Sequence, residues 1–133
     1  MRQLLAGIEA DLQSYQQMLD LIARQFEAAI RHQSENLAAI AQEIGALVDV
    51  LEARRAQRVE LATRLTGPQP TMEQVFALLK PDARARLEAD WAQLEGMVQT
   101  AREMGRRNAD LLAEQYTIMQ RVLHGDDQTY EPV

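Results

Sequence analysis

Between Leu5 and Ala29 the apolar residues of this chain recur at alternating intervals of three and four. The positions are Leu5, Ile8, Leu12, Tyr15, Leu19, Ile22, Phe26 and Ala29. A half-buried strand would need intervals of two, whereas intervals of three and four place all these side chains on one face of an α-helix. A seam this regular predicts a long helix that packs lengthwise against other helices, as in a coiled coil.

The seam then breaks and resumes one residue out of step. Its later positions are Leu37, Ile40, Ile44, Leu47, Leu51, Arg54, Arg58, Leu61 and Leu65. The break is either a stutter inside one continuous helix or a tight turn between two helices. A continuous helix would be about 97 Å long, which is more than the last helix could cover. We favour a turn at 32–34, with Ser34 capping the second helix and Arg31 and His32 in the last turn of the first.

Proline and glycine mark the remaining boundaries. The run Gly67-Pro68-Gln69-Pro70 ends the second helix, and Thr71 with Gln74 has the pattern of a capping box for a short helix. Pro81 opens the last helix, and Gly125 predicts its end. The predicted helices are 2–32, 34–66, 72–79 and 82–123. They form a single helical domain, 1–124, followed by a flexible acidic tail at 125–133.

Composition supports the same fold class, because the most abundant residues (Ala, Leu, Gln, Arg and Glu) are strong helix formers. The fold class is therefore all-α. We expect an antiparallel up-down-up three-helix bundle or coiled coil, with a short extra helix before the last long helix.

The charged and reactive residues argue against several classes of function. The chain has a formal charge of −6, no cysteine and only two histidines, His32 and His124. An acidic balance is atypical of a nucleic-acid binder, and without cysteine there is no thiolate nucleophile or zinc ribbon. No apolar run approaches the roughly 20 residues that cross a bilayer. We expect a cytoplasmic protein with no membrane insertion, catalytic group, metal or cofactor.

The sequence contains two clusters of arginines, each of which can be interpreted in two ways. Arg54, Arg55 and Arg58 form one cluster, and Arg102, Arg106 and Arg107 form the other, each interleaved with glutamates. A solvent-exposed face with salt bridges is the favoured interpretation, and a docking patch for an acidic partner is the alternative. Because Arg54 and Arg58 lie on the seam, we expect the second helix to pack poorly near its end.

The last helix carries a second apolar column beside its main seam, at intervals of seven: Met97, Met104, Leu111 and Ile118. A helix that touches two others needs a wide apolar stripe, which is one explanation. The other explanation is that part of the stripe stays exposed and receives an amphipathic helix from a partner, a role to which methionine is well suited. The main seam is weak beside this column, where Ala101, Gly105, Asn108 and Gln115 are small or polar.

The end of the chain resembles a known family. The stretch Arg107-Asn108-Ala109-Asp110-Leu111-Leu112, followed by Thr129-Tyr130-Glu131-Pro132, is similar to the flagellar export chaperones of the FlgN type. Members carry Asn-x-x-Leu-Leu on the last helix and a tyrosine in the tail, and Trp91 near the start of the last helix agrees with the same family.

The resemblance implies a cytoplasmic type III secretion chaperone in flagellum biogenesis. It would bind the C-terminal helical segments of hook–filament junction proteins, of the FlgK and FlgL type, and deliver them to the export gate. Tyr130 would dock on the gate. The resemblance and the apolar column together give the predicted partner-binding residues: Met97, Met104, Asn108, Leu111, Leu112, Ile118 and Met119. The alternative function is a structural or adaptor bundle that self-associates, as a homodimer, through the same stripe.

Overall fold

The computed structural model describes the backbone of residues 1–130 and the side chains of residues 1–124. Its elements are α1 (Arg2–Ile30), α2 (Ser34–Thr66), α3 (Met72–Phe76) and α4 (Pro81–Tyr130). The described residues contain no strand, which confirms the all-α class.

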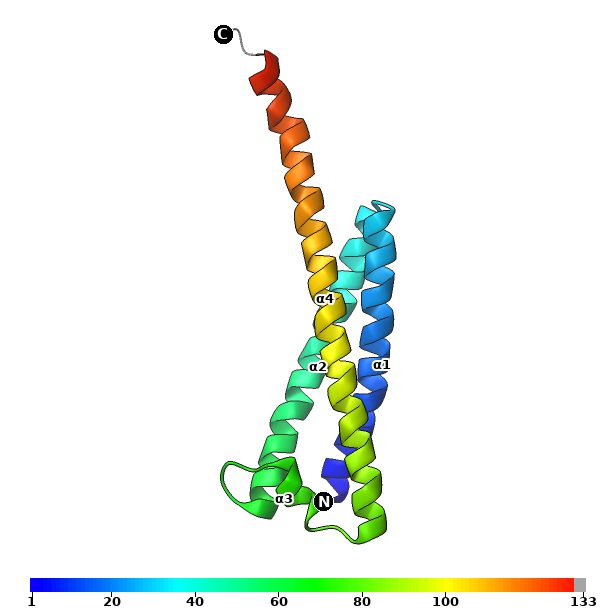
Figure 1. Ribbon diagram of the computed structural model, residues 1–133, viewed down its shortest axis with the longest axis vertical. Helices are drawn as coiled ribbons and strands as arrows, with labels where there is room; N and C mark the ends of the chain where they lie inside the picture. Colours follow the sequence, from blue (N-terminus) through cyan, green and yellow to red (C-terminus); the bar gives the residue numbers. More distant parts are fainter. Residues whose placement is uncertain (131–133) are drawn as a thin grey trace.

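The helix α1 is the centre of the arrangement. It packs against both α2 and α4, whereas the α-carbons of α2 and α4 nowhere approach within 8 Å of each other over the described residues. The three long helices alternate in direction along the chain, and α4 is the longest (Figure 1). The arrangement is therefore more open than a bundle in which the backbones of all three long helices pack closely together.

A tight turn connects α1 to α2 without glycine or proline. The amide of Gln33 donates to the Ala28 carbonyl at 2.9 Å and that of His32 to the Ala29 carbonyl at 3.2 Å, which is the Schellman pattern. His32 occupies the left-handed position of this motif, with φ of 55°. The prediction that Ser34 caps α2 is wrong, because Gln33 is the N-cap residue and no side chain caps this end.

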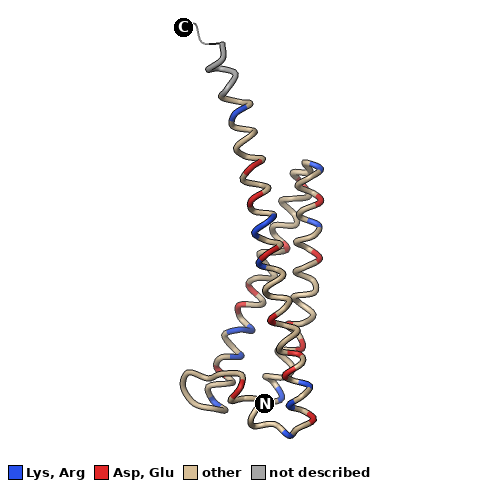
Figure 2. The backbone as a smooth tube through the Cα atoms, in the orientation of Figure 1, with Lys and Arg blue, Asp and Glu red and all other residues tan. Residues whose placement is uncertain are grey.

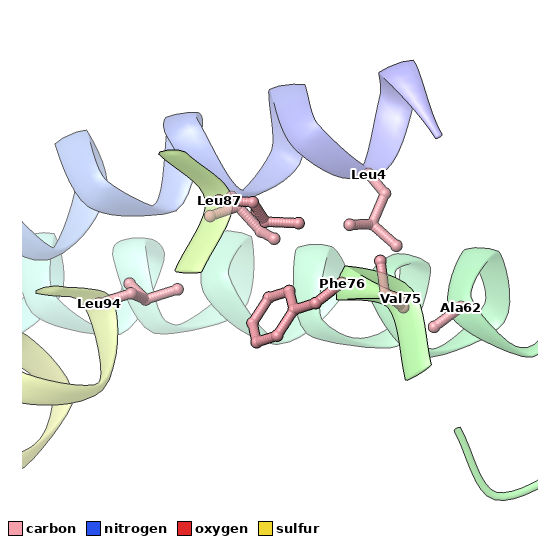
Figure 3. Packing of buried hydrophobic residues seen from close by; sticks show 7 residues of the cluster. Leu4, Ala62, Val75, Phe76, Leu87 and Leu94 are labelled. Carbon is pink, nitrogen blue, oxygen red and sulfur yellow. The ribbon is translucent and has the colours of Figure 1, made fainter. Parts of the chain in front are cut away.

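The short helix α3 closes one end of the molecule. Its capping box is present as predicted, with the Gln74 amide donating to Thr71 Oγ1 at 3.2 Å and the Thr71 amide to Gln74 Oε1 at 3.0 Å. Val75 and Phe76 point into an apolar cluster contributed by all four helices (Figure 3). This base cluster consists of Leu4, Ile8, Ala62, Val75, Phe76, Leu87 and Leu94. Because α3 contacts both α2 and α4, it joins two helices whose α-carbons stay more than 8 Å apart.

We expect Thr71→Ala to lower the free energy of unfolding by about 1 kcal/mol, because a helix N-cap loses its side-chain acceptor. Thr117→Ala is the matched control, since Thr117 lies exposed inside α4 and its hydroxyl bonds only to the Ala113 carbonyl of its own helix. Urea unfolding compares the two variants, and equal stabilities would contradict the role of the capping box.

A buried carboxylate joins α1 to α2. Asp11 has a side chain only 3% exposed, and its two oxygens accept from Arg54 Nη1 at 2.9 Å and from Arg58 Nη1 at 2.6 Å. Arg54 Nη1 also donates to Ser14 Oγ, and the Arg58 guanidinium lies 5.3 Å from the Trp91 ring centre. The seam positions of Arg54 and Arg58 are therefore filled by cross-helix ion pairs, and both guanidinium groups lie in the interface instead of on a solvent-exposed face.

The last helix is longer than predicted. It was expected to end before Gly125, but α4 continues to Tyr130. One glycine inside a helix costs only about 1 kcal/mol relative to alanine, and no proline lies between Pro81 and Pro132 to stop the helix. Of the predicted tail, residues 131–133 lie outside the described residues.

Candidate partner-binding surface

The last part of α4 extends past the rest of the molecule. Gln115 Nε2 donates to the Ala29 carbonyl at 2.9 Å, so residue 115 lies level with the last turn of α1, which ends at Ile30. Beyond that level α4 continues alone, past the α1–α2 turn (Figure 1). We call residues 116–124 the overhang. No described helix covers the overhang along its length, because α1 ends and α2 begins below that level.

Large apolar side chains are exposed along the overhang. Ile118 is 51% exposed, Met119 57% and Val122 59%, and Tyr116 and Leu123 are exposed to a similar degree. Between residues 116 and 124 only Arg121 carries a formal charge, so the overhang is almost free of charge (Figure 2). A cluster of large apolar side chains on one exposed helix marks an interaction surface more often than it marks an ordinary surface.

The overhang and the α1–α2 turn together form a groove of about 610 Å³. We call it the overhang groove. Its lining residues are His32, Ser34, Leu37, Leu112, Gln115, Tyr116, Ile118, Met119 and Val122. Apolar atoms of α4 form one wall, and the turn with the first residues of α2 forms the other. This shape suits an apolar helix side better than it suits a small polar ligand.

A second hollow separates α2 from α4 nearer the base cluster. Its volume is about 370 Å³, and it is lined by apolar residues such as Leu51 and Val98 and by charged residues of both signs, among them Glu95 and Arg102. The hollow is thus of mixed polarity and contrasts with the largely apolar overhang groove.

The seven predicted partner-binding residues divide into three groups. Leu112, Ile118 and Met119 line the overhang groove together. Met97, Met104 and Leu111 are half-buried outside it, and Met104 packs against a middle cluster formed by Met18, Ile22 and Leu51.

Asn108 forms the third group alone. It is 1% exposed, and its Nδ2 donates to the Ile22 carbonyl at 2.8 Å and to Gln25 Oε1 at 2.9 Å. Asn108 therefore connects α4 to α1 inside the molecule. The side chain of Tyr130, the predicted gate-docking residue, lies outside the described residues.

Sequence reasoning missed Leu37, Tyr116 and Leu123 as members of this surface. The predicted helix lengths could have indicated this surface, because the predicted last helix, 82–123, is longer than the predicted first helix, 2–32. A longer helix that packs beside a shorter one must leave one of its ends uncovered.

The described residues hold no group of three histidine, aspartate or glutamate side chains placed to bind a metal ion. None of the helices in that part of the chain combines the length and the apolar character needed to span a bilayer.

Comparison with known proteins adds a family to this geometry. A protein-family model described as FlgN protein matches residues 1–125, which is nearly the whole chain. No match was found among curated proteins or among solved structures. The matched span includes all of α1, α2 and α3 and the overhang of α4. The chain therefore belongs to the FlgN family of flagellar type III export chaperones.

Proposed function

We propose that this chaperone binds C-terminal helical segments of hook–filament junction proteins, and that the overhang groove is the centre of the binding surface. The observation that carries the proposal is the row of apolar side chains at Ile118, Met119 and Val122, each more than half exposed on the part of α4 that extends past the end of α1. An amphipathic helix laid along that row would remove its apolar area from water.

The proposed contact extends along α4 beyond the overhang. An interface of about 1,500 Å² is ordinary for a specific protein pair, and nine residues of one helix offer less area than that. The half-buried Leu111, Met104 and Met97 continue the apolar column toward the base, at intervals of seven. A partner helix that follows this column would gain the missing area, and methionine side chains would adapt to its shape.

Delivery to the export gate is the second half of the proposal. The support for it is the resemblance of Thr129-Tyr130-Glu131-Pro132 to the family tail, in which a tyrosine docks on the gate. Because Tyr130 ends α4, a partner on the overhang would be carried within a few helical turns of the docking residue.

The experiment that tests the proposed surface is the pair Ile118→Asp and Val122→Asp in one chain. Both residues lie past the end of α1, so helix content and unfolding midpoint should stay close to those of the unchanged protein. We expect at least a tenfold loss of affinity for a synthetic peptide of the junction-protein C-terminal helix, measured by calorimetry, because two carboxylates would be buried without partners.

Ala113→Asp with Thr117→Asp is the matched control. It adds the same charge to α4, at two exposed positions on the side of the helix opposite the apolar row. Equal affinities of the two double variants for the peptide would refute the proposed surface.

Self-association is the alternative occupant of the same surface. Sedimentation distinguishes it, because a stable homodimer that the peptide does not dissociate would favour a self-associating adaptor over a chaperone of junction proteins.

A further inference from the structure

The contact between α1 and α4 changes from apolar to polar toward the overhang. The base cluster and the middle cluster hold the lower part of α4 by apolar packing. From the level of Ile22 onward polar groups take part in the contact: Asn108 donates to the Ile22 carbonyl, Gln115 donates to the Ala29 carbonyl, and the Arg107 guanidinium lies 3.9 Å from the Phe26 ring centre. The two donors are seven residues apart and so are the two acceptors, which gives the pair of helices a repeating polar contact.

Apolar residues lie on both sides of these amides. At 100° per residue, Leu111 and Leu112 lie about 50° to either side of the line that joins Asn108 to Gln115 on α4. Rotating α4 by that amount in either direction would place a leucine against α1 and would bury apolar area that is now half-exposed. Because the same rotation would expose the leucine on the other flank, apolar burial alone does not select one rotation, whereas the two amide hydrogen bonds form only in the observed one.

The amide contact between α1 and α4 lowers the stability of the fold relative to an apolar contact. Asn108 Oδ1 is buried and has no hydrogen-bond partner among the described residues. A buried acceptor without a partner lowers stability, and a leucine at this position would avoid that loss. In coiled coils, a single buried asparagine fixes the alignment of helices at a cost in stability.

We propose that Asn108 and Gln115 are positioning residues, which set the rotation of α4 about its own axis. They keep Leu111 and Leu112 on the two flanks of the α1–α4 contact, where a partner helix can reach them. The claim that these two residues set the rotation depends only on their hydrogen bonds and burial. The claim that a partner helix reaches Leu111 and Leu112 rests on the proposed function. Asn108 thus acts on the partner surface from inside the molecule and does not touch the partner.

The chain has no cysteine, so a single introduced thiol reports the rotation. Leu111→Cys and Leu112→Cys are each placed in the unchanged chain and in a chain with Asn108→Ala and Gln115→Ala, which removes both amides without placing a leucine at the centre of the contact. The measurement is the rate at which a maleimide labels the thiol. Removing the amides should change the two rates in opposite directions, each at least threefold, because rotation that buries one flank exposes the other.

Thr117→Cys, on the outer side of α4, is the control whose labelling rate should not move. Rates at 111 and 112 that stay within twofold, or that change in the same direction, would overturn the proposal. If the double variant does not fold, the single variants Asn108→Ala and Gln115→Ala provide second backgrounds judged by the same criterion.

A binding measurement separates this proposal from the proposed function. At a temperature where both chains are folded, the Asn108→Ala, Gln115→Ala chain should bind the junction-protein C-terminal peptide at least fivefold more weakly than the unchanged chain. Opposite changes in labelling, with no peptide binding by any chain, would support the positioning role and refute the proposed function. Peptide binding without opposite changes in labelling would refute the positioning role alone.

Discussion

Asp11→Ala is expected to lower the free energy of unfolding by about 3–5 kcal/mol, the usual loss when one partner of a buried ion pair is removed. The carboxylate is 3% exposed and accepts from two arginines of α2, whose side chains are only 24% and 18% exposed. Without Asp11, Arg54 and Arg58, which lie one turn apart on α2, would both lose their carboxylate partner in the α1–α2 interface. Urea unfolding followed by circular dichroism measures the loss.

Two controls make this result specific to the ion pair. Asp20→Ala removes an exposed carboxylate from the same helix and should change stability by less than about 0.5 kcal/mol. The combined variant Asp11→Leu, Arg54→Met and Arg58→Met should recover most of the loss, because apolar side chains of similar volume commonly replace a buried ion network without penalty. A loss for Asp11→Ala no larger than that for Asp20→Ala would contradict the structural role of the pair.

The positions of the long helices follow from the sequence because seams at intervals of three and four and the prolines at 68, 70 and 81 leave few alternatives. The α1–α2 turn was predicted from the break in the seam and the length of the helices. Its geometry could not be predicted, since the left-handed position is filled by His32 and not by glycine.

The polar contacts between helices could not be predicted from the sequence, for a different reason. Asp11 lies 43 and 47 residues from the arginines that it pairs with, so no local pattern connects them. The available signal was that Arg54 and Arg58 occupy seam positions one helical turn apart, which requires an anion on the facing helix. Likewise, Asn108 and Gln115 were recognised as weak points of a seam, but their acceptors are backbone carbonyls, which no side-chain pattern reveals.

The candidate surface was predictable in part. Leu112, Ile118 and Met119 were named from the column and the family motif, and they do line one groove. The same motif suggested Asn108, whose burial could not be foreseen, because a heptad position gives the face of a helix and not the neighbour that covers it.

Phe76→Ala is expected to cost about 3–5 kcal/mol of stability, the usual range when a buried phenylalanine is truncated. Its ring lies in the base cluster, 8% exposed, on the short helix that joins α2 to α4. Since the α-carbons of α2 and α4 stay more than 8 Å apart, losing this ring removes packing that the two helix backbones cannot replace by direct approach. Leu78→Ala, two residues further on and 55% exposed, should cost less than about 1 kcal/mol.

The same variant tests whether the two ends of α4 act independently. The overhang lies at the opposite end of α4 from the base cluster (Figure 1). Below the unfolding transition, Phe76→Ala should therefore bind the junction-protein peptide with unchanged affinity, while amide exchange near Leu87 and Leu94 becomes faster. A loss of affinity in the folded variant would mean that α4 transmits the disturbance along its length, and the partner surface would then depend on the base as well as on Asn108 and Gln115.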